Sequence, residues 1–133
     1  MDMNTLVFIA GILAAMATLG HFTMGVRLYL RPLLASDIDI IPKKVMHTVF
    51  HYISVYMTLS AWMLIMIGIR GEDCMFDPTL LLSFIGMNYA LFAVTQILIA
   101  LTSKISGAIF KMFQWVFWIL IAVFTFMGIN AGC

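Results

Sequence analysis

Three histidines lie inside long apolar stretches of this sequence, and they are the residues best suited to chemistry. His21 falls in the first stretch, while His47 and His51 fall four residues apart near the start of the second. Ionisable side chains are costly at membrane depth and commonly mark a functional site. All six acidic residues lie outside the apolar stretches, which disfavours a carboxylate-driven antiporter or a proton channel. No Ser-His-Asp or Cys-His set indicates nucleophilic catalysis, so no catalytic residue is assigned and enzymatic activity stays open.

The histidines are candidate ligands for a metal or a haem. Imidazole binds haem iron, zinc, copper and non-haem iron. The four-residue spacing of His47 and His51 lets both rings point the same way on a helix. His21, His47 and His51 are therefore candidate ligands of a divalent transition metal. Alternatively, His21 and His51 could clamp a haem b between two helices, and the sequence leaves the identity of the cofactor open.

Two glutamines lie at a similar depth to these histidines. At about 1.5 Å per helical residue, His51 lies about 9 Å into the second stretch, and His21 about 13 Å from the end of the first. Gln96 and Gln114 each lie about 7 Å from the corresponding end of the third and fourth stretches. We therefore predict a histidine-lined pocket in the cytoplasmic half of the protein. His21 and His51 would contact a cofactor directly, with Gln96 and Gln114 supporting them.

A purely structural role for the same residues is the main alternative. His, Gln, Ser and Thr side chains often serve only to hydrogen-bond membrane helices together. In that case the protein is a non-catalytic accessory subunit of a larger membrane complex, or a homo-oligomer. Proton or quinone handling is a further alternative.

Composition predicts the elements that must position these residues. Hydrophobic residues make up 64% of the 133 residues and charged residues 10%, whereas soluble domains carry about 25% charge. Four apolar stretches, at residues 6–30, 45–69, 80–101 and 109–129, are each long enough to cross a bilayer, which takes about 20 helical residues. Their lack of two-residue alternation argues against a membrane barrel. We predict one all-α domain over residues 1–133, a bundle of four transmembrane helices within the lipid bilayer.

Charge predicts the orientation and excludes one class of partner. The first and third loops with their flanks carry six basic residues: Arg27, Arg31, Lys43, Lys44, Lys104 and Lys111. The opposite side carries only Arg70. Short basic loops stay in the cytoplasm, so both termini are expected outside it, in a bacterial inner membrane. The start of the chain lacks the basic residues of a cleaved signal peptide, so the first helix is expected to be retained. The net charge of +1 gives no indication of nucleic-acid binding.

That orientation places both cysteines on the same outer face. Cys74 lies in the second loop, and Cys133 is the last residue of the sequence. An oxidising outer compartment permits a disulfide, provided that the two Cα atoms lie within about 7 Å. A bonded pair and two unpaired thiols both remain open.

Small and polar residues predict which face of each helix is buried. On the first helix they are Gly11, Ala14, Thr18, His21 and Gly25. On the second they are His47, His51, Ser54 and Thr58. On the third they are Gly86, Tyr89, Ala90, Ala93 and Gln96, and on the fourth Gln114, Trp118, Ile121, Thr125 and Gly128. Pro32 and Pro42 are expected to bracket an irregular first loop, and Asp77 to cap the third helix.

Several short motifs resemble a set of small four-helix bacterial integral membrane proteins of uncharacterised activity. They are His21 with Gly25, Arg31-Pro32-Leu33, Phe50-His51, and Gln114-Trp115 at the start of the fourth helix. The resemblance covers most of the chain. It implies the four-helix fold and points to His21 and His51, but it implies no activity.

Overall fold

The computed structural model describes residues 3–70, 77–103 and 105–130 as helices joined by short turns. In chain order the helices are α1 (Thr5–Gly20), η1 (His21–Leu30), α2 (Arg31–Ala35), α3 (Ile40–Arg70), α4 (Thr79–Thr102), α5 (Ala108–Lys111) and α6 (Trp115–Asn130). The segment η1 is a π-helix. Cys74 and Cys133 lie outside the described residues, so the disulfide remains a prediction.

Three helical runs are long and apolar enough to cross a membrane. They are Thr5–Ala35, which joins α1, η1 and α2, then Ile40–Arg70 and Thr79–Thr102. The predicted all-helical class is therefore confirmed for the part of the chain that the structure describes, and three of its runs have the length and apolar character of membrane spans. The fourth predicted helix, at 109–129, is interrupted instead: α5 ends at Lys111, and α6 begins only at Trp115.

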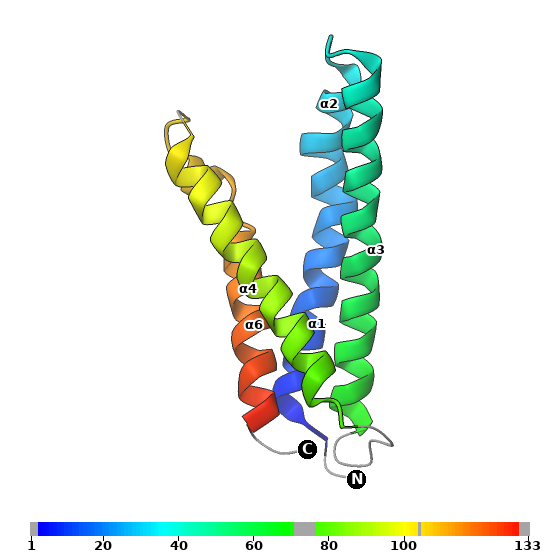
Figure 1. The fold of residues 1–133 in the computed structure, drawn as a ribbon, viewed down its shortest axis with the longest axis vertical. Coiled ribbons are helices and arrows are strands. Elements are labelled where there is room, and N and C mark those ends of the chain that lie inside the picture. The colour runs from blue at the N-terminus through cyan, green and yellow to red at the C-terminus, as the bar shows by residue number, and fades with distance from the viewer. Residues whose placement is uncertain (1–2, 71–76, 104, 131–133) are drawn as a thin grey trace.

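The helices form two antiparallel pairs that diverge from one end of the molecule. The run α1–η1–α2 lies along α3, and α4 lies along α6, with α1 also packed against α6. Figure 1 shows the two pairs meeting near the start of α1 and spreading apart toward α2 and the end of α4, like the letter V. The open end holds the turn at 36–39.

Glycines allow α1 and α3 to approach closely. A Cβ atom on Gly68 would lie 2.6 Å from the Cα of Phe8, and one on Gly11 would lie 2.7 Å from the backbone nitrogen of Ile65. Real atoms cannot come that close, so only glycine fits at these crossings. Membrane helices use small residues in this way because dispersion contacts between close backbones drive their association.

Asn4 ties the start of α1 to the end of α6. Its side-chain oxygen accepts a hydrogen bond from the backbone N–H of Val7, at 3.2 Å, which caps the helix. Its side-chain nitrogen donates to the carbonyl of Gly128, at 2.9 Å. One amide therefore stabilises a helix terminus and an interhelical contact together.

The first loop is shorter than predicted because both prolines lie within helices. Pro32 is the second residue of α2, near the end of the continuous helical run Thr5–Ala35. Pro42 lies in the first turn of α3, where a proline lacks no required N–H donor. The loop therefore covers only residues 36–39, and α3 begins at Ile40 rather than at residue 45.

Asp77 stabilises the start of α4 from one residue further out than predicted. Its carboxylate accepts a hydrogen bond from the backbone N–H of Thr79, at 2.9 Å, while Pro78 occupies the capping position. Hydrogen bonds from Thr79 hold the pKa of this carboxyl below its ordinary value.

The predicted inward faces hold for three of the four helices. Gly11, Ala14, Thr18 and Gly25 are buried, as are Gly86, Tyr89 and Ala93 on α4, and Ile121, Thr125 and Gly128 on α6. On α3 the prediction was wrong for His51 and Thr58, which are exposed. Ser54 is buried, but the rest of the buried face is Met57, Ser60, Ala61, Leu64, Ile67 and Gly68.

The α1–α3 contact predicts a sharp difference between two glycine substitutions. Gly68→Ala should destabilise the protein by about 1–3 kcal/mol, because the added methyl forces the backbones apart. Gly20→Ala is the matched control, since a Cβ at that position meets nothing within 4 Å. Unfolding of both variants in mixed micelles measures the difference. Equal stability of the two variants would contradict the close approach described here.

Candidate functional site: a pocket between the two helix pairs

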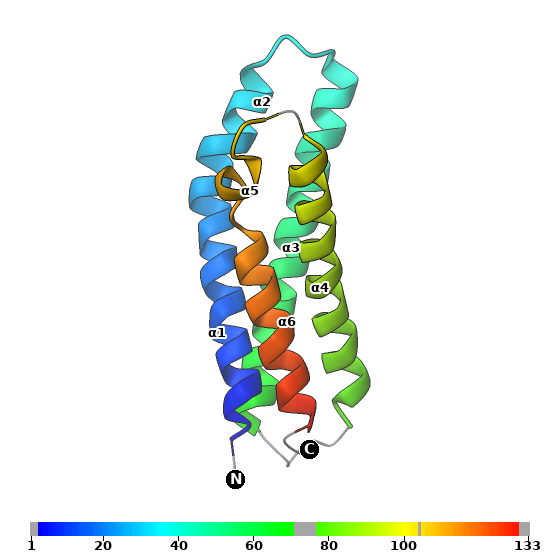
Figure 2. The same cartoon turned by 90° about the vertical axis from the view of Figure 1, so that its left-hand side faces the viewer.

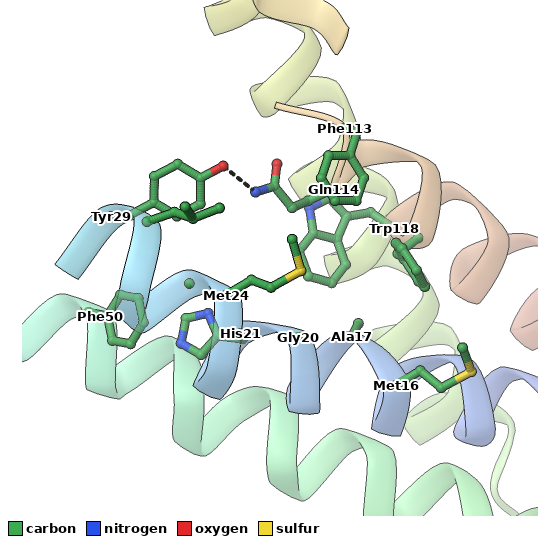
Figure 3. Close-up of a pocket in the computed structure, with 13 residues that line it drawn as sticks. Met16, Ala17, Gly20, His21, Met24, Tyr29, Phe50, Phe113, Gln114 and Trp118 are labelled. Atoms are coloured by element: carbon green, nitrogen blue, oxygen red, sulfur yellow. Dashed lines mark hydrogen bonds between the residues drawn. The ribbon is translucent and has the colours of Figure 1, made fainter. Parts of the chain in front are cut away.

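A pocket of about 300 Å³ lies between the two helix pairs. Its wall comes from α1 and η1 on one side and from Phe50 of α3 (Figure 3). The other side is made by Phe113, Gln114, Phe117 and Trp118. Most of the wall is apolar, with methionine, phenylalanine and leucine as its larger aliphatic and aromatic side chains. His21, Tyr29, Gln114 and Trp118 supply the groups that can form hydrogen bonds.

A chain of hydrogen bonds orients the two glutamines behind this wall. The indole N–H of Trp118 donates to Gln96 Oε1 at 2.8 Å, and Gln96 Nε2 donates to Gln114 Oε1 at 2.7 Å. Gln114 Nε2 then donates to the hydroxyl of Tyr29 at 3.0 Å. The last bond crosses from the turn before α6 to η1, joining the two helix pairs within the pocket wall (Figure 3).

The same glutamines explain how the fourth helix tolerates its break. Gln96 Nε2 also donates to the carbonyl of Met112, at 3.1 Å, and the indole N–H of Trp115 donates to the carbonyl of Ile109, at 3.0 Å. Backbone carbonyls freed at membrane depth must find partners inside the protein. Side chains from α4 and from the helix itself supply them here.

His21 is held against α3 by a stacked ring and a hydrogen bond. Its ring lies parallel to that of Phe50, with centroids 4.0 Å apart and an angle of 17° between the planes. His21 Nε2 lies 2.9 Å from Ser54 Oγ. The Ser54 hydroxyl itself donates to the carbonyl of Phe50, at 2.9 Å. With the Ser54 hydroxyl donating to Phe50, its one proton is used there, so Nε2 is the donor to Ser54 in this arrangement and Nδ1 of a neutral ring keeps a free lone pair.

The π-helical segment places His21, Gly25 and Tyr29 along the pocket. Its hydrogen bonds reach five residues back, as from the N–H of Arg31 to the carbonyl of Val26. His21 Nδ1 lies 3.6 Å from where a Cβ of Gly25 would be, on the pocket side of the ring (Figure 3). Such segments are rare and frequently occur at functional sites.

His47 and His51 lie elsewhere. Their Nε2 atoms are 3.1 Å apart, and neither residue lines the pocket. His51 is exposed and His47 half-buried. Across the described ranges, no three His, Cys, Asp or Glu side chains come together as a metal-binding group. The predicted layer of His21, His51, Gln96 and Gln114 thus divides: the glutamines pair, His21 contacts Ser54, and His51 pairs with His47.

Sequence reasoning missed three residues of the site. Tyr29 and Phe50 lack the spacing of a motif, and only a three-dimensional contact identifies them. Ser54 was placed on an inward stripe but not paired with His21. Ser54 lies four residues after Phe50 and three after His51 on the same helix. That spacing places it on their side of the helix but does not indicate which neighbouring helix it contacts.

The Gln96–Gln114 contact predicts a coupling free energy between α4 and the turn that precedes α6. A double-mutant cycle of Gln96→Leu and Gln114→Leu should give about 0.6 kcal/mol, the average for a hydrogen bond between membrane helices. Asn88→Leu provides the control, because Asn88 donates only to the carbonyl of Phe84 in its own helix. Its cycle with Gln114→Leu should be additive. Equal coupling in both cycles, measured by reversible unfolding, would contradict the pairing.

Comparisons with known proteins do not identify the site. No family model matches the chain, and no curated protein or solved structure is similar to it. The contacts of Tyr29, Gln114 and His21 therefore have to indicate what the pocket can hold.

Proposed function

We propose that this chain is an integral membrane protein that binds a small, largely apolar molecule with a polar group. The pocket between η1 and the start of α6 is the observation that carries the proposal. Its volume of about 300 Å³ lies at the lower end of the range for ligand sites, about 300–1,000 Å³. Such sites are mostly apolar, with a few converging polar groups, and this wall has that character.

The hydrogen-bonding capacity of the wall defines the polar group of the ligand. Tyr29 receives a hydrogen bond from Gln114, so its own proton is left for an acceptor. His21 Nδ1 keeps a lone pair for a donor, since Nε2 is directed to Ser54. Trp118 directs its N–H away to Gln96 and contributes only ring surface. A molecule with a hydroxyl, carboxylic acid or amide group satisfies both Tyr29 and His21.

A haem or a resident metal fits the same geometry less well. The haem b hypothesis needs His21 and His51 on opposite faces of one macrocycle, but His51 does not line the pocket. The Nε2 of His21 is already committed to Ser54, and Gln96 and Gln114 are paired with each other. A ligand held by hydrogen bonds uses the groups that remain.

The accessory-subunit alternative has a specific observation in its favour. The bond between His21 and Ser54 joins η1 to α3, which is the role expected of a polar residue that only holds helices together. Exposed apolar side chains on α3 and α4, such as Trp62 and Phe84, suit contact with lipid or with a larger complex. The two readings differ in whether a molecule occupies the pocket.

In the proposed membrane arrangement the chain crosses the bilayer four times. The helix α6 alone is about 24 Å long, short of a hydrocarbon core of about 30 Å, and α5 with its following turn completes the crossing. The Lys/Arg bias then favours both termini outside the cytoplasm, in a bacterial inner membrane. The pocket would lie in the cytoplasmic half.

Ligand binding predicts a molecule that copurifies with the protein. Protein taken from native membranes in lipid nanodiscs should release it at close to one equivalent on solvent extraction, as measured by mass spectrometry. Absorbance and metal analysis of the same sample test the haem and metal hypotheses. Gly20→Leu should abolish copurification, because its side chain fills the pocket from a position with free space around it.

A hydroxyl deletion separates binding from folding. Tyr29→Phe should weaken retention about fivefold, the effect of losing about 1 kcal/mol of hydrogen bonding. Tyr52→Phe is the matched control, because Tyr52 is exposed on α3 and lines no part of the pocket. If Gly20→Leu copurifies with the same molecules in the same amounts as the wild type, the pocket is not a ligand site and the accessory-subunit reading stands.

The orientation predicts an asymmetry in cysteine labelling. After reduction, a membrane-impermeant maleimide applied outside should label the natural Cys74 and Cys133. It should not label Ser103→Cys in a Cys74→Ser, Cys133→Ser background until the membrane is permeabilised. Labelling of that variant from outside would reverse the proposed topology.

A further inference from the structure

We infer that His47 and His51 form a two-histidine site for a divalent transition metal ion. This site lies on α3, apart from the pocket and independent of the function proposed for it. Neither residue lines the pocket, and the pocket needs neither of them. A failure of the proposed pocket function would therefore not affect this metal site, and the reverse also holds.

The distance between the two imidazoles matches a shared metal ion. Their Nε2 atoms are 3.1 Å apart. An ion at about 2.0–2.1 Å from each nitrogen would subtend an angle of about 100°, between the values of octahedral and tetrahedral coordination. The ring planes are tilted by 48°, so the two Nε2 atoms converge without the rings stacking.

Helical geometry makes this arrangement rigid. Residues four apart on a helix are neighbours on its surface, and both histidines lie within the continuous helix Ile40–Arg70. A metal ion there would bridge successive turns without distorting the backbone. His21 cannot join them through Nε2, because that nitrogen is bonded to Ser54.

The pair lies near the polar start of α3, which is the end from which an ion would reach it. His51 is exposed and His47 half-buried, and they lie about 5–11 Å along the helix from Lys44. Imidazole nitrogens favour Cu²⁺, Ni²⁺ and Zn²⁺ over Mg²⁺ or Ca²⁺. The described residues supply no third metal-ligating side chain, so the remaining coordination positions are left to water or an exogenous ligand. An exchangeable ion follows from such incomplete coordination.

The site can be tested with Cu²⁺ as the probe. Full-length, tag-free protein in nanodiscs, carrying Cys74→Ser and Cys133→Ser to remove thiol ligands, is titrated with Cu²⁺ and followed by electron paramagnetic resonance. The nitrogen hyperfine pattern should report two equatorial imidazoles on one bound ion. His47→Ala and His51→Ala should each lose the second nitrogen, and the double variant should lose the ion.

A relocated histidine provides the matched control. Combining His51→Ala with Thr48→His keeps the number of histidines but places them on adjacent residues, which do not face each other on a helix. That variant should bind Cu²⁺ no better than His51→Ala alone. Equal binding by the relocated variant and the parent, or a parent spectrum with fewer than two nitrogens, would overturn the inference.

Thermal unfolding of the parent protein tests metal binding without relying on the histidine variants, which could fold poorly. Ni²⁺ should raise the unfolding temperature of the parent, because an ion that binds only the folded helix stabilises it. Gly20→Leu, which fills the pocket, should show the same rise. No Ni²⁺-dependent shift in the parent would also count against the site.

Discussion

Polar groups placed among apolar helices must find their partners inside the protein, and the rest of the structure depends on that constraint. Unpaired backbone groups in hydrocarbon cost several kcal/mol each, and the break before α6 is accompanied by compensating bonds. The carbonyls of Ile109 and Met112 receive N–H groups from Trp115 and Gln96. The side chain of Asn4 accepts the N–H of Val7 at the start of α1 and donates to the carbonyl of Gly128. These bonds fix where the helices can end, break and cross.

The apolar pattern was enough to predict the helices but not their ends. Three spans follow from length and hydropathy because any such stretch must hydrogen-bond internally in a bilayer. Helix ends depend on weaker effects. Pro32 and Pro42 were expected to bracket the first loop, yet Pro32 lies within the helical run Thr5–Ala35 and Pro42 lies in the first turn of α3. The break after Lys111 depends on Gln96, from a helix distant in sequence, and no local pattern could have indicated it.

The candidate site was predictable in its members more than in its pairing. His21, Gln96 and Gln114 were identified because polar residues in apolar stretches are conspicuous, and Gln96 and Gln114 do bond to each other. The direction in which each side chain points was not predictable. The buried face of α3 is set by close approach at Gly68 and Ile65 rather than by its histidines. Rotation of that one helix by its glycine contacts leaves His51 exposed and directs Ser54 toward His21.

Because the two helix pairs diverge, the two walls of the pocket belong to different arms of the molecule. One wall, with His21 and Tyr29, belongs to the arm built from η1 and α3, and the other, with Gln114 and Trp118, belongs to the arm built from α4 and α6 (Figures 1 and 3). The arms are joined firmly near Asn4 and linked in the pocket wall by the bond between Gln114 and Tyr29. A molecule bound in the pocket would contact both arms at once, so its size would bear on the angle between them.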